Sequence, residues 1–306
     1  MFVKATKAEV KSRIAITGPS GSGKTLTALM WARELAGPDG KIAVIDTERD
    51  SAKLYADMVD FDTLSISPPY HPDRLVEILK AAESEGYAVV VSDSLSHFYN
   101  GAGGLLEIVD NAATRGGGGN NFAGWREGTP IQQRMVDALL NFNGHIVSTM
   151  RSKTEYALER DDRGKMVPKK LGMAAIQRDG IEYEFTIVLE MDTDHNTIVG
   201  KTRCDALANQ VFGPGKTLEA AKIFAQWLKS GDPFITDTER NALDEKIRVL
   251  KPEQRRLLKE GVAAQGLPKL ANLTDSRLAE YRALIDEVAS LQPEEAAPET
   301  TEDIPE

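Results

Sequence analysis

A glycine-rich octapeptide, Gly18-Pro19-Ser20-Gly21-Ser22-Gly23-Lys24-Thr25, constrains the fold of this chain more than any other segment. It lies between an apolar run expected to form a strand, 13–17, and a segment with helical apolar spacing, 25–35. In that context the pattern G-x-x-x-x-G-K-[ST] is typical of a loop whose backbone N–H groups close around phosphates, although a chance glycine-rich turn is the alternative. The sequence therefore predicts an α/β domain that binds a nucleoside triphosphate.

The residues of this loop have distinct expected roles. Lys24 would reach the β and γ phosphates, and Thr25 would be a ligand of Mg²⁺. The start of the following helix adds partial positive charge to the same place. The expected cofactors are ATP and Mg²⁺, and the residues expected to bind them are Gly18, Pro19, Ser20, Gly21, Ser22, Gly23, Lys24, Thr25 and Leu26.

Two carboxylates are candidates for the chemistry that such a loop supports. Asp93 follows the apolar run 87–92 and is placed to hold Mg²⁺ through water, with a helix cap as the alternative. Glu48 follows the run 41–46 and is the candidate to orient or deprotonate the attacking water, with a solvated surface glutamate as the alternative.

Short apolar runs alternate with helical stretches from residue 13 to about residue 203, which predicts a mostly parallel sheet covered by helices. A hairpin from 185–191 and 197–202, joined by the turn 192–196, would add antiparallel strands. Glycine clusters at 101–104 and 116–119 are expected to be mobile loops. The expected strands are 13–17, 41–46, 63–66, 87–92 and 145–149, and the expected helices are 25–35, 72–83 and 131–142.

Changes in amino-acid composition along the chain suggest four parts. We expect an N-terminal arm over 1–12, an ATPase domain over 13–231, a small helical appendage over 232–292 and a disordered acidic tail over 293–306. The appendage begins near a capping box, Thr236-Asp237-Thr238-Glu239. Its expected helices are 238–249, 252–265 and 275–291.

Net charge and cysteine content limit the class of protein. The formal charge is −10, from 37 Lys+Arg against 47 Asp+Glu, which argues against coating nucleic acid through overall basicity. However, the tail carries −6 of this charge, and the polar stretch 151–178 has a local net charge of +4.

The single cysteine, Cys204, excludes an intramolecular disulfide. With neither a signal peptide nor a membrane span in the pattern, a cytoplasmic protein without membrane contact is expected.

The order of the phosphate loop, the strand ending Asp46-Thr47-Glu48 and the strand ending Asp93-Ser94 resembles RecA-like recombinase ATPases. It resembles most the compact phage branch, the RecA-like members of the Sak group of single-strand annealing proteins. The resemblance covers about residues 13–203 and implies that Glu48 is the catalytic glutamate. It also implies that Tyr55 stacks on adenine, with a buried core tyrosine as the alternative.

The same resemblance implies a γ-phosphate sensor at the end of the strand that follows the magnesium aspartate, here the fifth strand. The family's usual sensor is glutamine, whereas this sequence offers Thr149, with Ser148 or Arg151 as substitutes. Lys201 and Arg203 resemble basic residues that reach the γ-phosphate of an adjacent subunit; two solvated cations are the alternative.

The basic stretch lies where this family carries its DNA-binding loops, so it is expected to bind single-stranded DNA, unless it is an ordinary solvated loop. The candidate DNA-binding residues are Arg151, Lys153, Tyr156, Arg160, Arg163, Lys165, Lys169, Lys170 and Arg178.

The sequence thus indicates an ATP-dependent recombination or annealing protein that forms a ring or filament of its own copies. A single-strand-binding protein is a possible further partner, and the host cytoplasm is the expected location if a phage encodes it. The alternatives are a P-loop ATPase of phage replication or packaging, or a non-catalytic scaffold gated by nucleotide.

Overall fold

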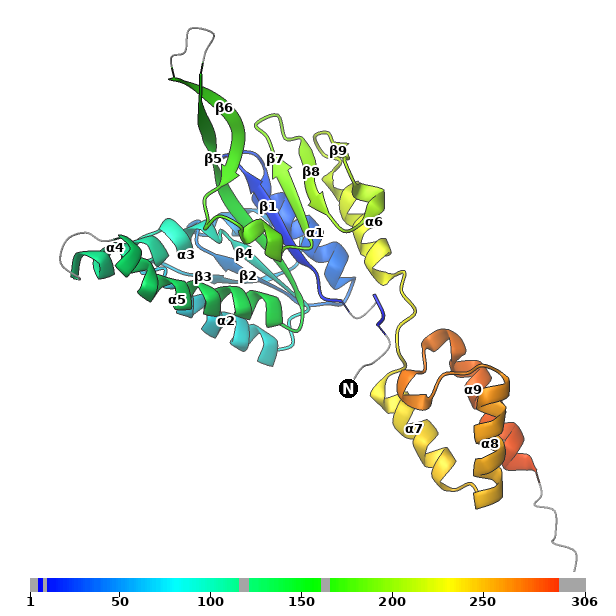
Figure 1. Cartoon of the computed structure of the whole chain (residues 1–306). Coiled ribbons are helices and arrows are strands. Elements are labelled where there is room, and N and C mark those ends of the chain that lie inside the picture. Colours follow the sequence, from blue (N-terminus) through cyan, green and yellow to red (C-terminus); the bar gives the residue numbers. More distant parts are fainter. Residues whose placement is uncertain (1–4, 8–9, 116–120, 161–165, 292–306) are drawn as a thin grey trace, which may run out of the picture. The chain divides into compact units, whose positions relative to one another are not determined.

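The computed structural model describes residues 5–7, 10–115, 121–160 and 166–291. It divides into two compact units, one from Lys11 to Trp227 and one formed by Met1–Val10 with Leu228–Glu306. The larger unit contains the phosphate loop (Figure 1). Within the described part of the chain, no helix is long and apolar enough to cross a membrane.

The larger unit is built on one sheet with the strand order β3-β2-β4-β5-β1-β7-β8-β9. All pairings from β3 to β7 are parallel, while β8 and β9 add antiparallel strands at one edge. The predicted α/β class, with a mostly parallel sheet and an added hairpin, is confirmed. The strands are β1 Arg13–Gly18, β2 Ile42–Asp46, β3 Asp62–Ser65, β4 Val89–Asp93, β5 His145–Arg160, β6 Met166–Ala175, β7 Ile187–Met191, β8 Thr197–Thr202 and β9 Val211–Phe212.

Helices cover both faces of this sheet, with α2 and α5 on one face and α1 with α6 on the other (Figure 1). On the second face, Trp31 of α1 is fully buried and its ring lies 5.5 Å from that of Phe224 in α6. The helices are α1 Lys24–Ala36, α2 Pro72–Ser84, α3 Ser96–Asn100, α4 Leu105–Arg115, α5 Asn121–Asn141 and α6 Thr217–Lys229, with 3₁₀ turns η1 Ser51–Tyr55, η2 Ile181–Glu184 and η3 Asp205–Leu207.

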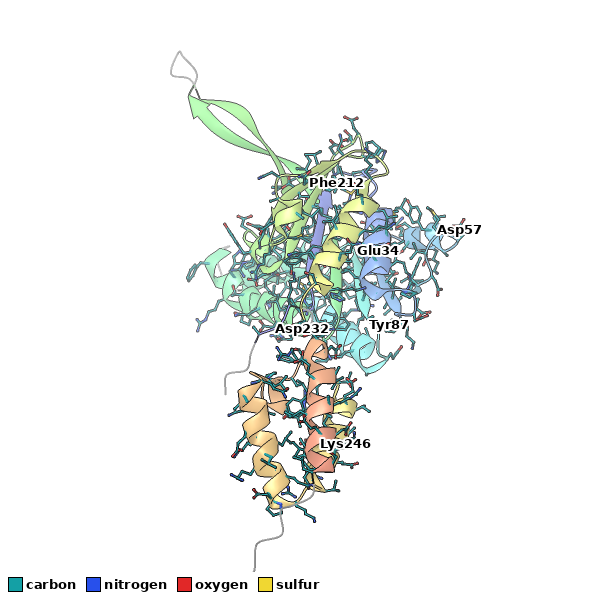
Figure 2. The ribbon with its side chains drawn as sticks, turned by 90° about the vertical axis from the view of Figure 1, so that its right-hand side faces the viewer. Glu34, Asp57, Tyr87, Phe212, Asp232 and Lys246 are labelled. Carbon is teal, nitrogen blue, oxygen red and sulfur yellow. The ribbon has the colours of Figure 1, made fainter. Side chains whose placement is uncertain are left out.

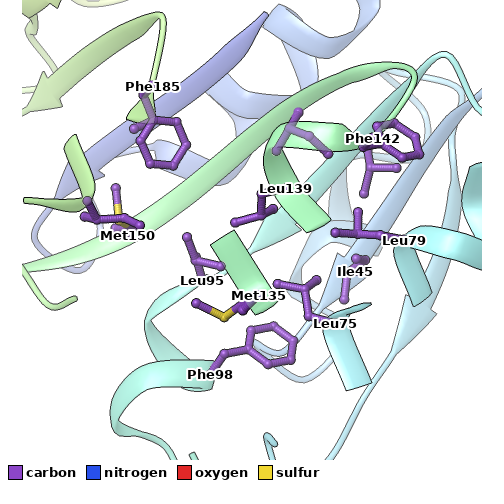
Figure 3. Packing of buried hydrophobic residues seen from close by; sticks show 14 of the residues in the cluster. Ile45, Leu75, Leu79, Leu95, Phe98, Met135, Leu139, Phe142, Met150 and Phe185 are labelled. Carbon is purple, nitrogen blue, oxygen red and sulfur yellow. The ribbon is translucent and has the colours of Figure 1, made fainter. Parts of the chain in front are cut away.

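The core on the α2 and α5 face is a single apolar cluster. Side chains of both helices meet those of the sheet strands there, and α3 adds the fully buried ring of Phe98 (Figure 3). This burial fixes α5 against the sheet and so fixes where the strands that follow it begin. Its larger members are Ile45, Leu75, Leu79, Leu95, Phe98, Met135, Leu139, Phe142, Met150 and Phe185.

Three helices and part of a fourth were absent from the sequence prediction, and one of the three is α6, whose segment 217–229 was not assigned to any helix. α3 and α4 occupy the region expected to be loop, and α5 begins at Asn121 rather than at residue 131. Gly124 and Gly128 lie inside α5, where a Cβ would collide with Val109 of α4, so glycine permits the close approach of the two helices. The glycine cluster 101–104 forms the turn between α3 and α4, and the cluster 116–119 lies outside the described residues.

The polar stretch 151–178, expected to be a loop, is largely a β-hairpin, which we call the arm. β5 pairs with β1 and β4 through its first half, and from Ser152 onward it pairs antiparallel with β6, out to Arg160 opposite Met166. Figure 1 shows the arm projecting from the sheet. Polar composition misled the prediction, because the two strands of the arm pair with each other and composition does not reveal that pairing.

The smaller unit is a helical bundle of α7 Asp237–Arg248, α8 Pro252–Ala264 and α9 Asp275–Ser290, with a 3₁₀ turn η4 Leu270–Asn272. Its start carries the predicted capping box, in which Thr236 Oγ1 accepts a hydrogen bond from Glu239 N and Glu239 accepts one from Thr236 N. Lys246, labelled in Figure 2, forms an ion pair with Asp286 across α7 and α9. The tail 293–306 lies outside the described residues.

A buried guanidinium ties α5 to the start of the sheet. Arg13 is 6% exposed, and its two terminal nitrogens donate hydrogen bonds to the carbonyls of Ser12, Gly144, Leu140 and Phe142 at 2.6 to 3.2 Å. Burial lowers the pKa of Arg13 to about 10. Three of these carbonyls lie at or just beyond the C-terminal end of α5, so this cation stabilises the connection between α5 and β5.

Replacing Arg13 by methionine therefore leaves several buried carbonyls without donors. We expect Arg13→Met to lower the free energy of unfolding by about 3 kcal/mol, measured by urea denaturation. Arg126→Met, the same change at an exposed position of α5, is the control and should have little effect. Equal stability of the two variants would contradict the structural role of Arg13.

Candidate active site

The phosphate loop connects β1, an inner strand of the sheet, to α1. Gly23 is the residue before α1 and has φ 91°, in the left-handed region that favours glycine. Lys24 Nζ donates a hydrogen bond to the Pro19 carbonyl at 2.6 Å, so the amine lies folded over its own loop. Burial lowers the pKa of Lys24, while the negative charges of Asp93 and Glu48 act to raise it.

Asp93 lies at the end of β4, and its side chain is 2% exposed. One carboxylate oxygen accepts a hydrogen bond from Thr25 Oγ1 at 2.7 Å, and the other accepts one from Thr149 Oγ1. Burial raises the pKa of Asp93, and these two hydrogen bonds oppose that rise. A hydroxyl and a buried carboxylate in contact are hard oxygen donors, so Thr25 and Asp93 fit a Mg²⁺ site.

Glu48 is held by an arginine from the base of the arm. Arg151 Nε donates to Glu48 Oε1 at 3.0 Å and Arg151 Nη2 donates to Oε2 at 2.5 Å, which engages both carboxylate oxygens. Burial acts to raise the pKa of Glu48, but the hydrogen bonds and charge of Arg151 outweigh it, so the pKa is lowered. Ser96 Oγ accepts a hydrogen bond from Arg151 N at 3.0 Å, which fixes the backbone that carries the guanidinium.

These groups border one cavity of about 760 Å³. Ten of its lining residues were predicted from the sequence: Ser20, Gly21, Gly23, Lys24, Thr25, Leu26, Glu48, Tyr55, Asp93 and Arg151. Gly18, Pro19 and Ser22 belong to the loop but are not among the lining residues. Four lining residues were not predicted: Ser51, Ser152, Ile176 and His195.

The unpredicted residues follow from strand order. β7 lies directly beside β1, so the turn after β7, with His195, comes to the phosphate loop. The carboxyl ends of parallel strands meet at one edge, which was a usable signal for this turn. Ser152 and Ile176 lie at the base of the arm, where its two strands begin and end. The sequence did not reveal that these strands pair.

The candidates for the sensor lie in different environments, and Ser148 is fully buried and not among the residues that line the cavity. Thr149 is fully buried, donates to Asp93 and is not among the residues that line the cavity. Arg151 lines the cavity and stands beside Glu48. Of the three, Arg151 is therefore the one whose side chain can reach a ligand, and the sensor role stays a prediction.

Lys201 and Arg203 do not line the cavity of their own chain. Lys201 Nζ donates hydrogen bonds to the carbonyls of Glu182, Tyr183 and Phe185 at 2.8 to 2.9 Å. It therefore has a structural role at the C-terminal end of η2. Arg203 is exposed just after β8. Their action on a neighbouring subunit stays a prediction.

The predicted DNA-binding residues are spread over the arm and its surroundings. Lys153 is exposed on β5, and Arg178 stacks on Trp125 of α5 with its guanidinium carbon 4.7 Å from the ring centre. The backbone places Tyr156, Arg160, Lys169 and Lys170 on the two strands of the arm, but their side chains lie outside the description. Arg163 and Lys165 lie outside the described residues altogether.

Comparison with known proteins adds to this geometry. The sequence model of a family described as "AAA domain" matches residues 10–220. Protein RecA of Staphylococcus epidermidis is 25% identical over 240 residues, covering 76% of this chain and 64% of that protein. Protein RecA of Staphylococcus carnosus is 25% identical over 244 residues with the same shares. The chain thus spans less than two thirds of the length of these relatives. A KaiC-like protein of Pyrococcus horikoshii has 13% identity and a TM-score of 0.38, over 69% of this chain and 94% of that one.

The hydrogen bond from Thr149 to Asp93 makes a testable contribution to stability. We expect Thr149→Val to lower the free energy of unfolding by about 2 kcal/mol, because a buried charged acceptor loses a donor. Thr149→Ser should restore most of the loss in urea denaturation.

The matched control is Thr197→Val. Thr197 is 1% exposed, and its hydroxyl has no hydrogen-bond partner among the described residues. The same substitution should therefore leave stability unchanged or raise it there. An equal loss at both positions would show that the effect comes from packing and not from support of Asp93.

Proposed function

The chain belongs to this AAA domain family, and on that premise we propose that it is an ATPase that binds single-stranded DNA and promotes strand pairing or annealing. We place it with the RecA-like phage proteins of the Sak group, acting as an oligomer of its own copies. The observation that carries the proposal is that Lys24, Thr25, Asp93 and Glu48 border one cavity, although they come from three different parts of the sheet.

Each of these residues has a role in the hydrolysis of ATP. The loop would cradle the phosphates with its backbone N–H groups, and Lys24 would exchange the Pro19 carbonyl for the β and γ phosphates. Thr25 and Asp93 would hold Mg²⁺, which neutralises charge on the phosphates when it is bound. Tyr55, in η1 at the same cavity, is the ring available to adenine.

Glu48 must be released before it can act on water. A carboxylate that accepts two hydrogen bonds from a guanidinium is a weak base, and both oxygens of Glu48 are engaged by Arg151. A γ-phosphate held by Lys24 would offer Arg151 another anion in the same cavity. Transfer of the guanidinium to the phosphate would free Glu48 to orient the attacking water and would stabilise charge in the transition state.

The arm supports the DNA-binding part of the proposal. Residues 151–178 carry eight Lys and Arg against four Asp and Glu in a chain of net charge −10. Cations on a projecting hairpin can follow a phosphate backbone, and neighbouring copies would add their arms to the same path. Arg151, Ser152 and Ile176 belong both to the base of the arm and to the nucleotide cavity, so DNA on the arm and nucleotide in the cavity would share these residues.

ATP turnover with and without single-stranded DNA tests the proposed function. The wild type should hydrolyse ATP faster when single-stranded DNA is present. Glu48→Gln should lose about 100-fold in turnover, because water is no longer activated, while it still binds ATP. Glu77→Gln, the same change at an exposed position of α2, should behave as the wild type.

Three other results would each point elsewhere. Turnover without DNA stimulation and without loss in Glu48→Gln would rule out the recombinase assignment. Stimulation by duplex DNA alone would favour a packaging or replication ATPase. Binding of ATP with no turnover in the wild type would favour a scaffold gated by nucleotide.

A mixing experiment tests whether active sites are shared between subunits. Arg203→Ala should lose turnover because a cation at the neighbour's γ-phosphate is missing, and the exposed position makes loss of folding an improbable cause. When Arg203→Ala and Glu48→Gln proteins are mixed, roughly a quarter of the interfaces combine two intact halves, so partial activity should return. Unchanged turnover in Arg203→Ala alone would contradict a shared site.

A further inference from the structure

His195 lies over the phosphate loop, in the turn that joins β7 to β8. Its imidazole Nδ1 is 3.6 Å from the position that a Cβ would take on Gly23, and the side chain lines the same cavity as Lys24. The imidazole is therefore within van der Waals reach of the loop at Gly23, where the φ of 91° is what favours glycine. His195 was not among the residues that the sequence singled out.

Hydrogen bonds within the turn hold His195 in this position. The Asp192 carboxylate accepts hydrogen bonds from Asp194 N at 3.0 Å, from Asn196 N at 2.8 Å and from Asn196 Nδ2 at 2.8 Å. His195 itself has φ 62°, in the left-handed region where glycine or asparagine is favoured. Histidine adopts this region more often than most residues other than glycine, so the turn accommodates the imidazole here.

The preceding residues pack on the other end of the loop. A Cβ on Gly18 would lie 2.6 Å from the Met191 carbonyl oxygen, and Met191 Cε is 3.6 Å from the corresponding position on Gly23. The end of β7 and its turn therefore form an outer wall along the phosphate loop. A ligand held by the backbone N–H groups of this loop lies next to that wall.

We propose that His195 is a nucleotide-binding residue that donates a hydrogen bond from its imidazole to the phosphate chain. This inference rests on the proposed function, because it needs a nucleotide in the cavity. An imidazole N–H is a good donor to phosphate oxygens. The phosphate chain is the target rather than the base, because the imidazole borders Gly23 of the phosphate loop, whereas the ring available to the base is that of Tyr55 in η1.

Calorimetric titration of the full chain with MgATP and with magnesium tripolyphosphate tests this contact. His195→Gly removes the imidazole and favours the turn's positive φ, so the turn should persist. We expect about tenfold weaker binding of both ligands. His195→Gln keeps an N–H donor and should recover most of the affinity, and Thr193→Ala, in the same turn, should bind as the wild type.

The outcomes separate this inference from the proposed function. Unchanged affinity of His195→Gly for both ligands would overturn the contact. Weaker binding of MgATP alone would also overturn it, because the contact would then be to the nucleoside. If the Gly variant loses thermal stability, failure of His195→Gln to bind better than His195→Gly would overturn it. A wild type that binds neither ligand, or a Lys24→Ala variant that binds both as the wild type does, would instead refute the nucleotide site itself.

Discussion

The buried carboxylate of Asp93 is the interaction on which the rest of the site depends. Its oxygens accept hydrogen bonds from Thr25 at the start of α1 and from Thr149 on β5, and its backbone carbonyl accepts one from Thr47 after β2. A charge this deep in the protein needs donors from all sides. Those donors bring the ends of β1, β2, β4 and β5 to one point, and this is where the phosphate loop opens into the cavity.

The parts of the fold that the sequence predicted correctly are those determined locally. The phosphate loop is a contiguous pattern, and the inner strands are apolar runs with no competing helical spacing. α3, α4 and the first half of α5 were missed because the glycine clusters beside them, and the glycines within α5, suggested loop, and α6 was missed as well. Gly124 and Gly128 are compatible with a helix only because Val109 of α4 packs against them, which is a tertiary contact. The arm was missed for a related reason, since its strands are held by pairing with each other.

In the candidate site too, residues marked by a local pattern could be predicted, and residues brought in by the fold could not. Lys24, Thr25, Asp93 and Glu48 could be assigned because each ends a strand or begins a helix at the edge where parallel strands finish. The ion pair between Glu48 and Arg151 joins residues 103 positions apart, and the sequence offers no pattern for it. His195 belongs to the site because β7 lies beside β1; the sequence indicated that its turn ends a strand but not which strand would be its neighbour.

The path of β5 has a mechanical consequence. Its residues from His145 to Ser148 lie between β1 and β4, and pairing with β1 continues to Arg151, so this part cannot shift without breaking the centre of the sheet. Its second half leaves the sheet at Ser152 and pairs only with β6. The arm is therefore anchored in the sheet at one end, and it leaves the sheet between Arg151 and Ser152. Arg151, which holds Glu48, is the last residue of β5 that pairs with β1, so it lies where the part of β5 inside the sheet meets the part that leaves it.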